Sequence, residues 1–381
     1  MKNLKAQLPR EVIGYYPSWQ WYDRSQLVNP ETIVYSKYSI INYAFFQPNK
    51  DGTISGLDSW ADEVLLQGKI NYQTEPISHY PNTSLVDLAH QAGTKVLISI
   101  GGWSKSDLFS DIAQDSSKRT TFALECRRLV EIYKLDGIDI DWEYPGVADR
   151  YGKPYDKQNF TFLLRGIKEQ LDSLSVKTGQ MYLLTAAFGA FESAMQNIEW
   201  ADVHPLLTSI NMMTYDFHGA WDKQAGHNSP LYAAVGDSSQ SHIDGTINLL
   251  TSKYGVPTEK INMGLSFYGR SLKTEGNSTF SSLLTGKVDT ILFKEDDGSP
   301  MFYNILNKKE HFNEHWDDAA KVPYLTGKDS LNTFLSYDNE RSIAIKAQYI
   351  VEKKLKGAIL WDLTGDYIQN ADSTISTPLL D

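Results

Sequence analysis

The chain has 381 residues, of which 41% are hydrophobic and 22% are charged, as in globular proteins with a sizeable core. A formal net charge of −11 argues against a nucleic-acid partner, because Lys and Arg bind the phosphates of nucleic acids. Cys126 is the only cysteine, which excludes an internal disulfide. We interpret it as a buried, unreactive thiol in an amphipathic helical stretch.

No apolar run is long enough to span a membrane. The basic start from Met1 to Lys5 has no apolar run behind it, so no secretory signal is visible. We therefore expect a protein that stays inside the cell, or a mature or trimmed form of a secreted one.

Short apolar runs alternate with amphipathic helical patterns along the chain. We predict strands at 12–16, 39–46, 95–100, 135–142, 181–187, 208–214, 260–267 and 357–362, and helices at 85–91, 116–134, 157–174, 243–254 and 339–355. A long loop is expected after the second strand. Eight buried strands, mostly separated by helices, predict an α/β fold of the (β/α)₈ TIM-barrel type.

The gap between the seventh and eighth strands is too long for one helix. It holds turn residues and strand-like pieces, so we predict a small α+β insertion domain at 271–336 on a barrel made of 1–270 and 337–381. His311 and His315 in this insertion fit an HxxEH zinc pattern. Because no third ligand is singled out, we interpret this piece as a surface turn or helix and expect no metal.

Polar and aromatic residues gather at the predicted C-terminal ends of the strands, where TIM barrels carry their active sites. They include Tyr15, Phe46, Gly102, Trp103, Asp141, Trp142, Glu143, Met213, Tyr215, Asp216, Tyr268, Arg270, Trp361 and Asp362. This clustering is the main structural argument for an enzyme.

Three acids on the fourth strand stand out. Asp139, Asp141 and Glu143 are spaced by two residues, so in an extended strand they share one face, roughly 6.5–7 Å apart. A solvent-facing acidic strand is the alternative. Asp is a poor strand former and neighbouring carboxylates repel each other, so the row favours a catalytic role.

Glycoside hydrolysis usually needs two carboxyl groups that flank the scissile bond, about 5–5.5 Å apart in ordinary retaining enzymes. Here the best acids lie on one strand and on one side. One of them can reach the leaving oxygen, and its neighbours cannot easily reach the opposite face of the sugar. A 2-acetamido group of the substrate could supply the nucleophile instead.

Four motifs carry a resemblance to family 18 glycoside hydrolases, the chitinases. The stretch Asp136-Gly-Ile-Asp-Ile-Asp-Trp-Glu143 resembles the DGxDxDxE signature of this family, and Ser99-Ile-Gly-Gly102 resembles its SxGG motif. Met213-Thr-Tyr-Asp216 resembles its MxYD motif, and Trp361 resembles the Trp that floors the central sugar site. The insertion after Arg270 is similar to the extra domain of the deep-cleft subfamily.

The resemblance implies a catalytic role for each acid. Glu143 would protonate the glycosidic oxygen and then activate water, Asp141 would bind the acetamido N–H, and Asp139 would share a proton with Asp141. Tyr215 would position the acetamido oxygen, and Asp216 would help to hold a distorted sugar.

The resemblance also implies substrate-binding residues: Trp361, Trp103, Trp221, Tyr15, Phe46, Tyr144, Met213, Arg270 and Gly102. Trp361 would lie under the distorted sugar, while Trp103 and Trp221 would serve the leaving-group side. Arg270 would bind sugar or a carboxylate.

The expected function is a secreted, extracellular chitinase that hydrolyses chitin and chitooligosaccharides with retention. We expect no cofactor, metal, nucleic acid or membrane partner, and a monomer. There are two alternatives: an endo-β-N-acetylglucosaminidase acting on N-glycans, and an inactive chitin-binding lectin. Such lectins typically lose the catalytic glutamate, whereas this chain keeps it as Glu143.

Overall fold

A computed structural model describes residues 8–237, 239–276 and 278–381, so the stretch from Met1 to Lys5 interpreted above lies outside the described residues. The chain divides into two compact units. The first unit comprises the described parts of Met1–Met212, Gly255–Asn262 and Lys356–Ala358. The second unit comprises the described parts of Met213–Tyr254, Met263–Leu355 and Ile359–Asp381.

Eight strands form a closed parallel barrel, which confirms the predicted fold class. Their order is β1-β16-β10-β9-β8-β7-β6-β2, and β2 pairs with β1 to close the sheet. The strands are β1 (Glu11–Pro17), β2 (Ile40–Pro48), β6 (Lys95–Gly101), β7 (Gly137–Asp141), β8 (Leu183–Gly189), β9 (Ser209–Met213), β10 (Ile261–Ser266) and β16 (Gly357–Trp361). Nearly every residue in them is buried, because a parallel sheet covered by helices is apolar on both faces.

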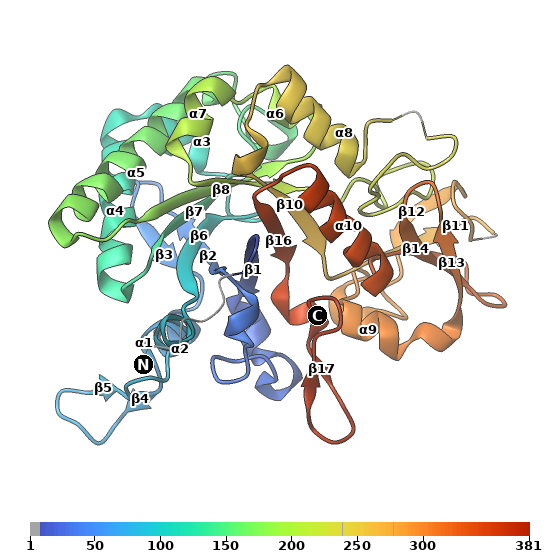
Figure 1. The fold of residues 1–381 in the computed structure, drawn as a ribbon, viewed down its shortest axis with the longest axis horizontal. Helices are drawn as coiled ribbons and strands as arrows, with labels where there is room; N and C mark the ends of the chain where they lie inside the picture. Colours follow the sequence, from blue (N-terminus) through green and yellow to red (C-terminus); the bar gives the residue numbers. More distant parts are fainter. Residues whose placement is uncertain (1–7, 238, 277) are drawn as a thin grey trace. The chain divides into compact units, whose positions relative to one another are not determined.

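The predicted helices of the first unit are α2 (Leu85–Ala92), α4 (Ser116–Tyr133) and α5 (Asp156–Thr178). Asp115 caps α4 by accepting hydrogen bonds from the backbone N–H groups of Ser117 and Lys118, which satisfies donors that a helix start leaves free. The helices α4 and α5 pack side by side (Figure 1). Cys126 on α4 is fully buried, and burial raises the pKa of its thiol well above the usual value, which supports the interpretation of an inert thiol.

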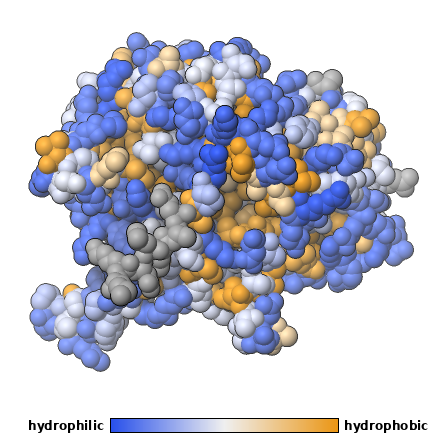
Figure 2. Space-filling model, viewed as in Figure 1, coloured by the Kyte–Doolittle hydropathy of each residue, from blue (hydrophilic) through white to orange (hydrophobic). Residues whose placement is uncertain are grey.

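The predicted long loop after β2 is wrong. It contains β3 (Ile54–Gly56), which pairs with β2, then α1 (Ser59–Gln67) and a hairpin of β4 (Ile70–Asn71) and β5 (Ser78–His79). Asp58 starts α1 by accepting from the N–H groups of Trp60 and Ala61. The hairpin projects at the lower left of Figure 1, and Figure 2 shows this projection as mainly hydrophilic. Its paired strands are two residues long, too short to show a periodic pattern.

Three further short helices of the first unit were also not predicted: α3 (Phe109–Gln114), α6 (Glu192–Met195) and α7 (Trp200–Leu206). Each has fewer than two full turns, so its apolar spacing is not distinctive. In the described part of the chain, no helix is both long enough and apolar enough to cross a membrane.

The second unit contains a five-stranded antiparallel sheet of order β12-β11-β15-β14-β13. Its strands are β11 (Arg270–Thr274), β12 (Leu284–Val288), β13 (Phe312–Asp317), β14 (Val322–Gly327) and β15 (Thr333–Ser336), with α9 (Phe302–Asn307) between β12 and β13. Leu272 and Phe334 pack in its core together with Ala225, which comes from the segment after β9. The sheet therefore lies where an α+β insertion was expected, and it also buries a residue from outside that range.

The remaining elements of this unit are α8 (Ile243–Asn248), α10 (Glu340–Glu352) and a hairpin of β17 (Ile368–Gln369) and β18 (Ile375–Ser376). The predicted helix at 243–254 continues beyond α8 as a π-helical turn, Leu249–Lys253.

The predicted turn or helix is found at His311, which lies in a short 3₁₀ turn, and is wrong at His315, which lies in strand β13. The two histidines therefore do not lie one turn apart on a single helix, which is the arrangement that a helical zinc motif needs. His315 Nε2 lies 2.8 Å from the Thr326 hydroxyl, and its ring stacks on Tyr324 at 4.8 Å between centroids.

Candidate active site

The acid row is buried in the first unit, with Asp139 and Asp141 in β7 and Glu143 two residues beyond its end. Asp139 is 0% exposed, Asp141 4% and Glu143 7%. Ser99 on β6 and Thr185 on β8 stand opposite Asp139 in the sheet register. Charged side chains are almost never this buried unless partners hold them, so the contacts of each acid define what the row can do.

Asp139 accepts four hydrogen bonds. Oδ2 accepts from Tyr15 Oη (2.9 Å) and Ser99 Oγ (2.7 Å), and Oδ1 accepts from Thr185 Oγ1 (2.5 Å) and Asn211 Nδ2 (3.2 Å). Tyr15 was expected to border the central sugar site, and in the structure its hydroxyl donates to Asp139. Ser99, Thr185 and Asn211 had no role assigned from sequence, although each is a polar residue inside an otherwise apolar strand.

A column of amides continues below Asp139. Asn262 Nδ2 donates to Asn211 Oδ1 (3.0 Å) and to Glu11 Oε1 (2.8 Å). Since Asn211 receives a donor at Oδ1, its own Nδ2 points to Asp139. The orientation of the amide that contacts Asp139 is therefore set from the base of the barrel interior.

The two aspartates differ in how they hold a proton. Burial raises the pKa of Asp139, and its four donors oppose this effect. Burial, followed by repulsion from Glu143 and Asp139, raises the pKa of Asp141 well above its usual value. Asp141 Oδ1 has no hydrogen-bond partner among the described residues. Asp141 is therefore the acid that keeps a proton most readily, because no donor stabilises its charge.

Ser106 fixes the backbone that carries the last acid. Its hydroxyl accepts from Glu143 N–H (2.9 Å) and lies within donor reach of the carbonyls of Gly102 (2.9 Å) and Asp141 (3.2 Å). Gly102 N–H also donates to the Asp141 carbonyl (2.7 Å). The Gly102 φ of +84° and the lack of room beside the Phe45 ring exclude a side chain at this position. Gly102 thus joins the two strand ends, a backbone role.

Trp142 anchors the opposite face of the same strand end. Its ring stacks on Phe109 (5.2 Å between centroids, 16°) and meets Phe160 edge-on. The predicted division of β7 into acidic and apolar faces is consistent with this packing, since Trp142 lies among the rings of α3 and α5.

Trp103 and Tyr144, two of the aromatic residues expected near the acids, each contact another side chain of the first unit. Trp103 is 62% exposed, and the Arg150 guanidinium lies 3.5 Å from the centroid of its ring. Arg150 also donates to the Trp103 carbonyl. Tyr144 meets Phe191 edge-on at 5.1 Å. Trp103 is therefore presented outward with one face covered by a cation.

The expectation for Phe46 is corrected. This side chain is 2% exposed and packs edge-on against Tyr43 (6.2 Å) and against Tyr133 of α4 (6.1 Å), so it belongs to the layer between β2 and the helices. Phe45 is the ring beside Gly102, and it lies 6.1 Å from Trp19. A register irregularity between Ala44 and Phe46 disturbs the alternation on which the sequence argument relied.

The second unit holds a cluster of polar and aromatic side chains around Asp216. Its Oδ1 accepts from Tyr268 Oη (2.5 Å), Arg270 Nε (2.8 Å) and Arg270 Nη2 (2.7 Å). Tyr215 is 9% exposed and lies edge-on to Tyr268 at 6.1 Å. Arg270 was expected to bind a sugar or a carboxylate, and the structure gives it the Asp216 carboxylate. Tyr268 had no role assigned from sequence.

Trp221 belongs to this cluster through Arg270, whose guanidinium lies 5.3 Å from its ring centroid. The Trp221 side chain is 62% exposed. Trp361 and Met213 are half-buried at the ends of β16 and β9. These positions at strand ends agree with the sequence argument, which placed polar and aromatic residues there.

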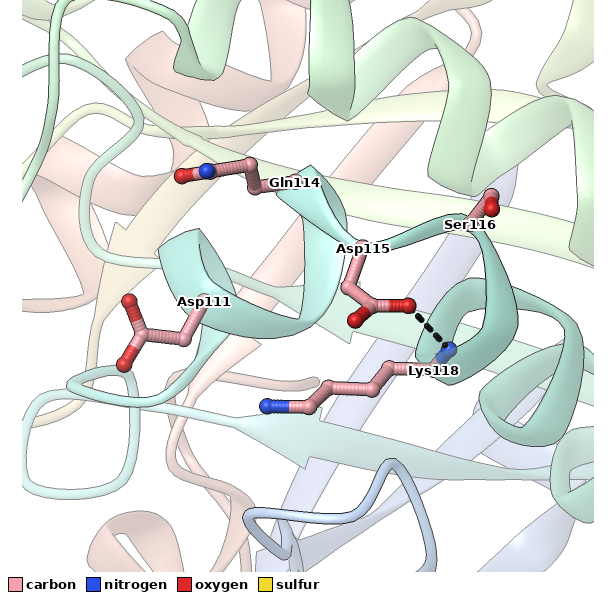
Figure 3. Close-up of a pocket in the computed structure, with 5 residues that line it drawn as sticks. All are labelled: Asp111, Gln114, Asp115, Ser116 and Lys118. Carbon is pink, nitrogen blue, oxygen red and sulfur yellow. Dashed lines mark hydrogen bonds between the residues drawn. The ribbon is translucent and has the colours of Figure 1, made fainter.

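A polar surface pocket elsewhere on the first unit is unrelated to the acid row. It lies where α3 ends and α4 begins, lined by Asp111, Gln114, Asp115, Ser116 and Lys118 (Figure 3). Asp115 already caps α4 there. Among the described residues, no group of three or more His, Cys, Asp or Glu side chains could hold a metal ion.

A (β/α)₈ barrel with buried acids at the C-terminal end of one strand is typical of barrel glycosidases. A family model described as "Glycosyl hydrolases family 18" matches residues 11–366. Chitinase A1 of Niallia circulans is 33% identical over 412 residues, which cover 93% of this chain and 56% of that protein.

Solved chitinase structures are similar to this chain over nearly its whole length. Chitinase ChiA74 from Bacillus thuringiensis has a TM-score of 0.85 at 32% identity, covering 97% of this chain and 68% of the other. The second catalytic domain of an Ostrinia furnacalis Group II chitinase, in complex with penta-N-acetylchitooctaose, has a TM-score of 0.85 at 26% identity, covering 97% and 94%. This chain therefore belongs to family 18 of the glycosyl hydrolases. It spans only about half (56%) of the length of the Niallia circulans relative.

Proposed function

We propose that this chain is a chitinase that hydrolyses β-1,4-linked N-acetylglucosamine in chitin and chitooligosaccharides with retention of configuration. The observation that carries this proposal is the state of Asp141. It lies between two other carboxyl groups, its pKa is strongly raised by burial and by their charges, and its Oδ1 lacks a partner among the described residues. Once it passes its proton to Asp139, the Asp141 carboxylate can accept a hydrogen bond from an acetamido N–H and stabilise the cation that then forms.

Glu143 is the proton donor. As the C1–O bond breaks, the acetamido carbonyl oxygen attacks C1 and the Glu143 carboxyl group protonates the leaving oxygen. Asp141 passes its proton to Asp139, and the Asp141 carboxylate neutralises the oxazolinium ion that results. The Glu143 carboxylate then takes a proton from water, and the water oxygen attacks C1. The C1–O bond of the oxazolinium ring breaks in this step, which restores the acetamido group and the protonated Glu143.

Substrate positioning is assigned to the MxYD motif and to aromatic side chains. Tyr215 donates its hydroxyl to the acetamido oxygen, and Asp216, itself held by Tyr268 and Arg270, contacts the distorted sugar. Flat indole rings suit the apolar faces of sugars, so we assign sugar contacts to Trp361, Trp103 and Trp221. Met213, Tyr144 and Tyr15 border the central sugar in this proposal.

We further propose that 271–336, which contains the five-stranded sheet, is the insertion domain on a barrel of 1–270 and 337–381. A polymeric substrate of this kind is met outside the cell, so we propose a secreted, extracellular protein. The proposed state is a monomer.

The test is hydrolysis of N-acetylglucosamine hexamer, followed by proton NMR of the first product. We expect cleavage with the β-anomer formed first, and Glu143→Gln should lose about 10³-fold or more in kcat through loss of the general acid. Glu169→Gln, at an exposed glutamate on α5, is the matched control and should be fully active. An inverted product would rule out the acetamido route.

The two alternatives give different results. Cleavage of a high-mannose glycoprotein but not of the hexamer would assign the site to N-glycans. Binding of the hexamer without cleavage by the unmodified chain would indicate a lectin. A fully active Glu143→Gln protein would refute the assigned proton donor.

A further inference from the structure

A fully buried ion pair lies in the second unit, apart from the side chains to which the proposed reaction assigns roles. Lys346 Nζ on α10 contacts both carboxylate oxygens of Asp338, at 2.6 and 2.7 Å, and both side chains are 0% exposed. Replacing such a pair with apolar residues often leaves stability unchanged or higher. Stability alone is therefore a weak reason for these two charges.

One hydrogen-bonded branch runs from Lys346 to the segment after β9. Lys346 Nζ donates to Ser229 Oγ (3.0 Å), and Ser229 Oγ donates to the carbonyl of Thr214 (2.8 Å). This branch ends on the peptide group just before Tyr215.

A second branch runs from Asp338 to the other side of Tyr215. Asp338 Oδ2 accepts from Ser266 Oγ (3.2 Å), and Ser266 Oγ accepts from Asn228 Nδ2 (3.2 Å). Asn228 Oδ1 then accepts from the backbone N–H of Asp216 (3.0 Å). Ser229, Ser266 and Asn228 are each at most 3% exposed, so water does not compete for these bonds.

The two charges fix the direction of every bond in the branches. An ammonium group can only donate, so Ser229 must use its own hydrogen on Thr214. A carboxylate can only accept, so Ser266 donates to Asp338 and must accept from Asn228. The Asn228 amide is thereby oriented with its oxygen toward Asp216. A neutral pair would leave both hydroxyls free to turn.

The segment needs such support because Asp216 has a φ of +57°. A non-glycine residue persists in this left-handed region only where its surroundings hold it. Phe217 N–H adds a further tie by donating to the Asn228 carbonyl (3.0 Å). The backbone on both sides of Tyr215 is therefore held by groups that trace back to one ion pair.

We propose that the Lys346–Asp338 ion pair, acting through Ser229 and through Ser266 with Asn228, positions the peptide segment that carries Tyr215 and Asp216 for the reaction. The link to catalysis rests on the proposed function, whereas the positioning of the segment does not. Lys346, Asp338 and Asn228 are positioning residues in this view, because they act only through Tyr215 and Asp216.

The first measurement is hydrogen–deuterium exchange of peptides that cover 213–217, since it needs no substrate. We compare the unmodified chain with Ser229→Ala, with Ser266→Ala and with the double variant Lys346→Met/Asp338→Leu, which leaves no unpaired charge. We expect exchange in 213–217 to become about tenfold faster in each, because local opening becomes easier. Unchanged exchange would overturn the proposal, whether or not the protein hydrolyses any sugar.

The second measurement is the split between kcat and KM on N-acetylglucosamine hexamer. We expect kcat to fall about tenfold and KM to change by less than about threefold, because Tyr215 acts on the transition state. Lys273→Met is the matched control: it removes the cation that pairs with Asp289, a buried carboxylate of the same unit (3.3 Å), and should lower the thermal midpoint without changing kcat.

The outcomes separate the two proposals. Faster exchange with wild-type kcat in the double variant would show that the ion pair orders the segment without serving the reaction, and would overturn the catalytic link. Lack of hydrolysis by the unmodified chain would refute the proposed function, while faster exchange in the variants would still support positioning of the segment. A double variant that loses thermal stability with no change in exchange or kcat would show a purely structural pair.

Discussion

Ser106→Ala tests whether the backbone clamp on the acid row matters for catalysis. The Ser106 hydroxyl is the acceptor for Glu143 N–H at 2.9 Å, and Glu143 is 7% exposed. Alanine cannot accept this hydrogen bond, and little water reaches the group. A buried donor left without its acceptor costs about 1–3 kcal/mol. We therefore expect the free energy of unfolding to fall by that amount.

The same loss should appear in the rate. If the Glu143 backbone shifts to regain an acceptor, its carboxyl group leaves the position from which it protonates the substrate. A penalty of about 1–3 kcal/mol on the transition state corresponds to a roughly 5- to 150-fold lower kcat. KM should change little, because Ser106 contacts backbone groups and not the sugar in this proposal. The assay is steady-state hydrolysis of N-acetylglucosamine hexamer, combined with urea unfolding followed by fluorescence.

Ser84→Ala is the matched control. Ser84 is also a buried serine, and its hydroxyl accepts a backbone N–H bond from Asp87 (2.9 Å) at the start of α2. Losing this cap costs about 1 kcal/mol of stability and should leave kcat unchanged. If Ser106→Ala and Ser84→Ala lose similar stability and both keep full kcat, the clamp does not position the acid and the reasoning fails.

Three further predictions concern other parts of the first unit. Burial raises the pKa of Asp62 from 3.8 to about 6, so the stability that its protonated form contributes is complete below pH 3.8 and is lost as the pH rises through 6. Measured by urea unfolding, the free energy of unfolding of Asp62→Asn should gain about 3 kcal/mol relative to wild type between pH 3.5 and 7. A difference that stays constant with pH would contradict this prediction. Arg150→Met removes the guanidinium that lies over the Trp103 ring, a cation–π contact of about 0.5–1 kcal/mol. KM for the hexamer should therefore rise roughly two- to fivefold. An unchanged KM would show that the contact with Arg150 does not order the Trp103 ring. A hydrogen bond to Asp136 raises the pKa of His90 above 6.5, so the stabilising effect of the protonated imidazole is present below pH 6.5 and is lost as the pH rises through the raised pKa. The difference in thermal midpoint between wild type and His90→Gln should therefore shrink from pH 6 to pH 9. A difference independent of pH would exclude the hydrogen bond between His90 and Asp136.

The barrel could be predicted because its strands are buried on both faces. Such strands leave near-continuous apolar runs, and the long helices α4 and α5 between them leave periodic patterns. The hairpin of β4 and β5 could not be predicted, because two-residue strands produce no pattern. The strand at His315 was missed because its polar residues fit a surface turn equally well.

The acid row could be located from its spacing alone, but the side chains that donate hydrogen bonds to it could not be identified from the sequence. Thr185 and Asn211 reach Asp139 from two other strands, and this contact depends on the register between strands far apart in the sequence. A polar residue at the corresponding position of each apolar strand is the sequence pattern from which Thr185 and Asn211 could have been predicted. Phe46 was misplaced because the irregularity in β2 shifts which neighbouring side chain faces each side.

The lone thiol of this protein has a practical consequence. Cys126 is fully buried and holds its proton tightly, so thiol-directed reagents should ignore the native chain and modify only a cysteine introduced on the surface. Spin labels or fluorophores can then be attached one at a time without first removing a native cysteine. A pair of labels, one in each compact unit, would report on the distance between the units during turnover.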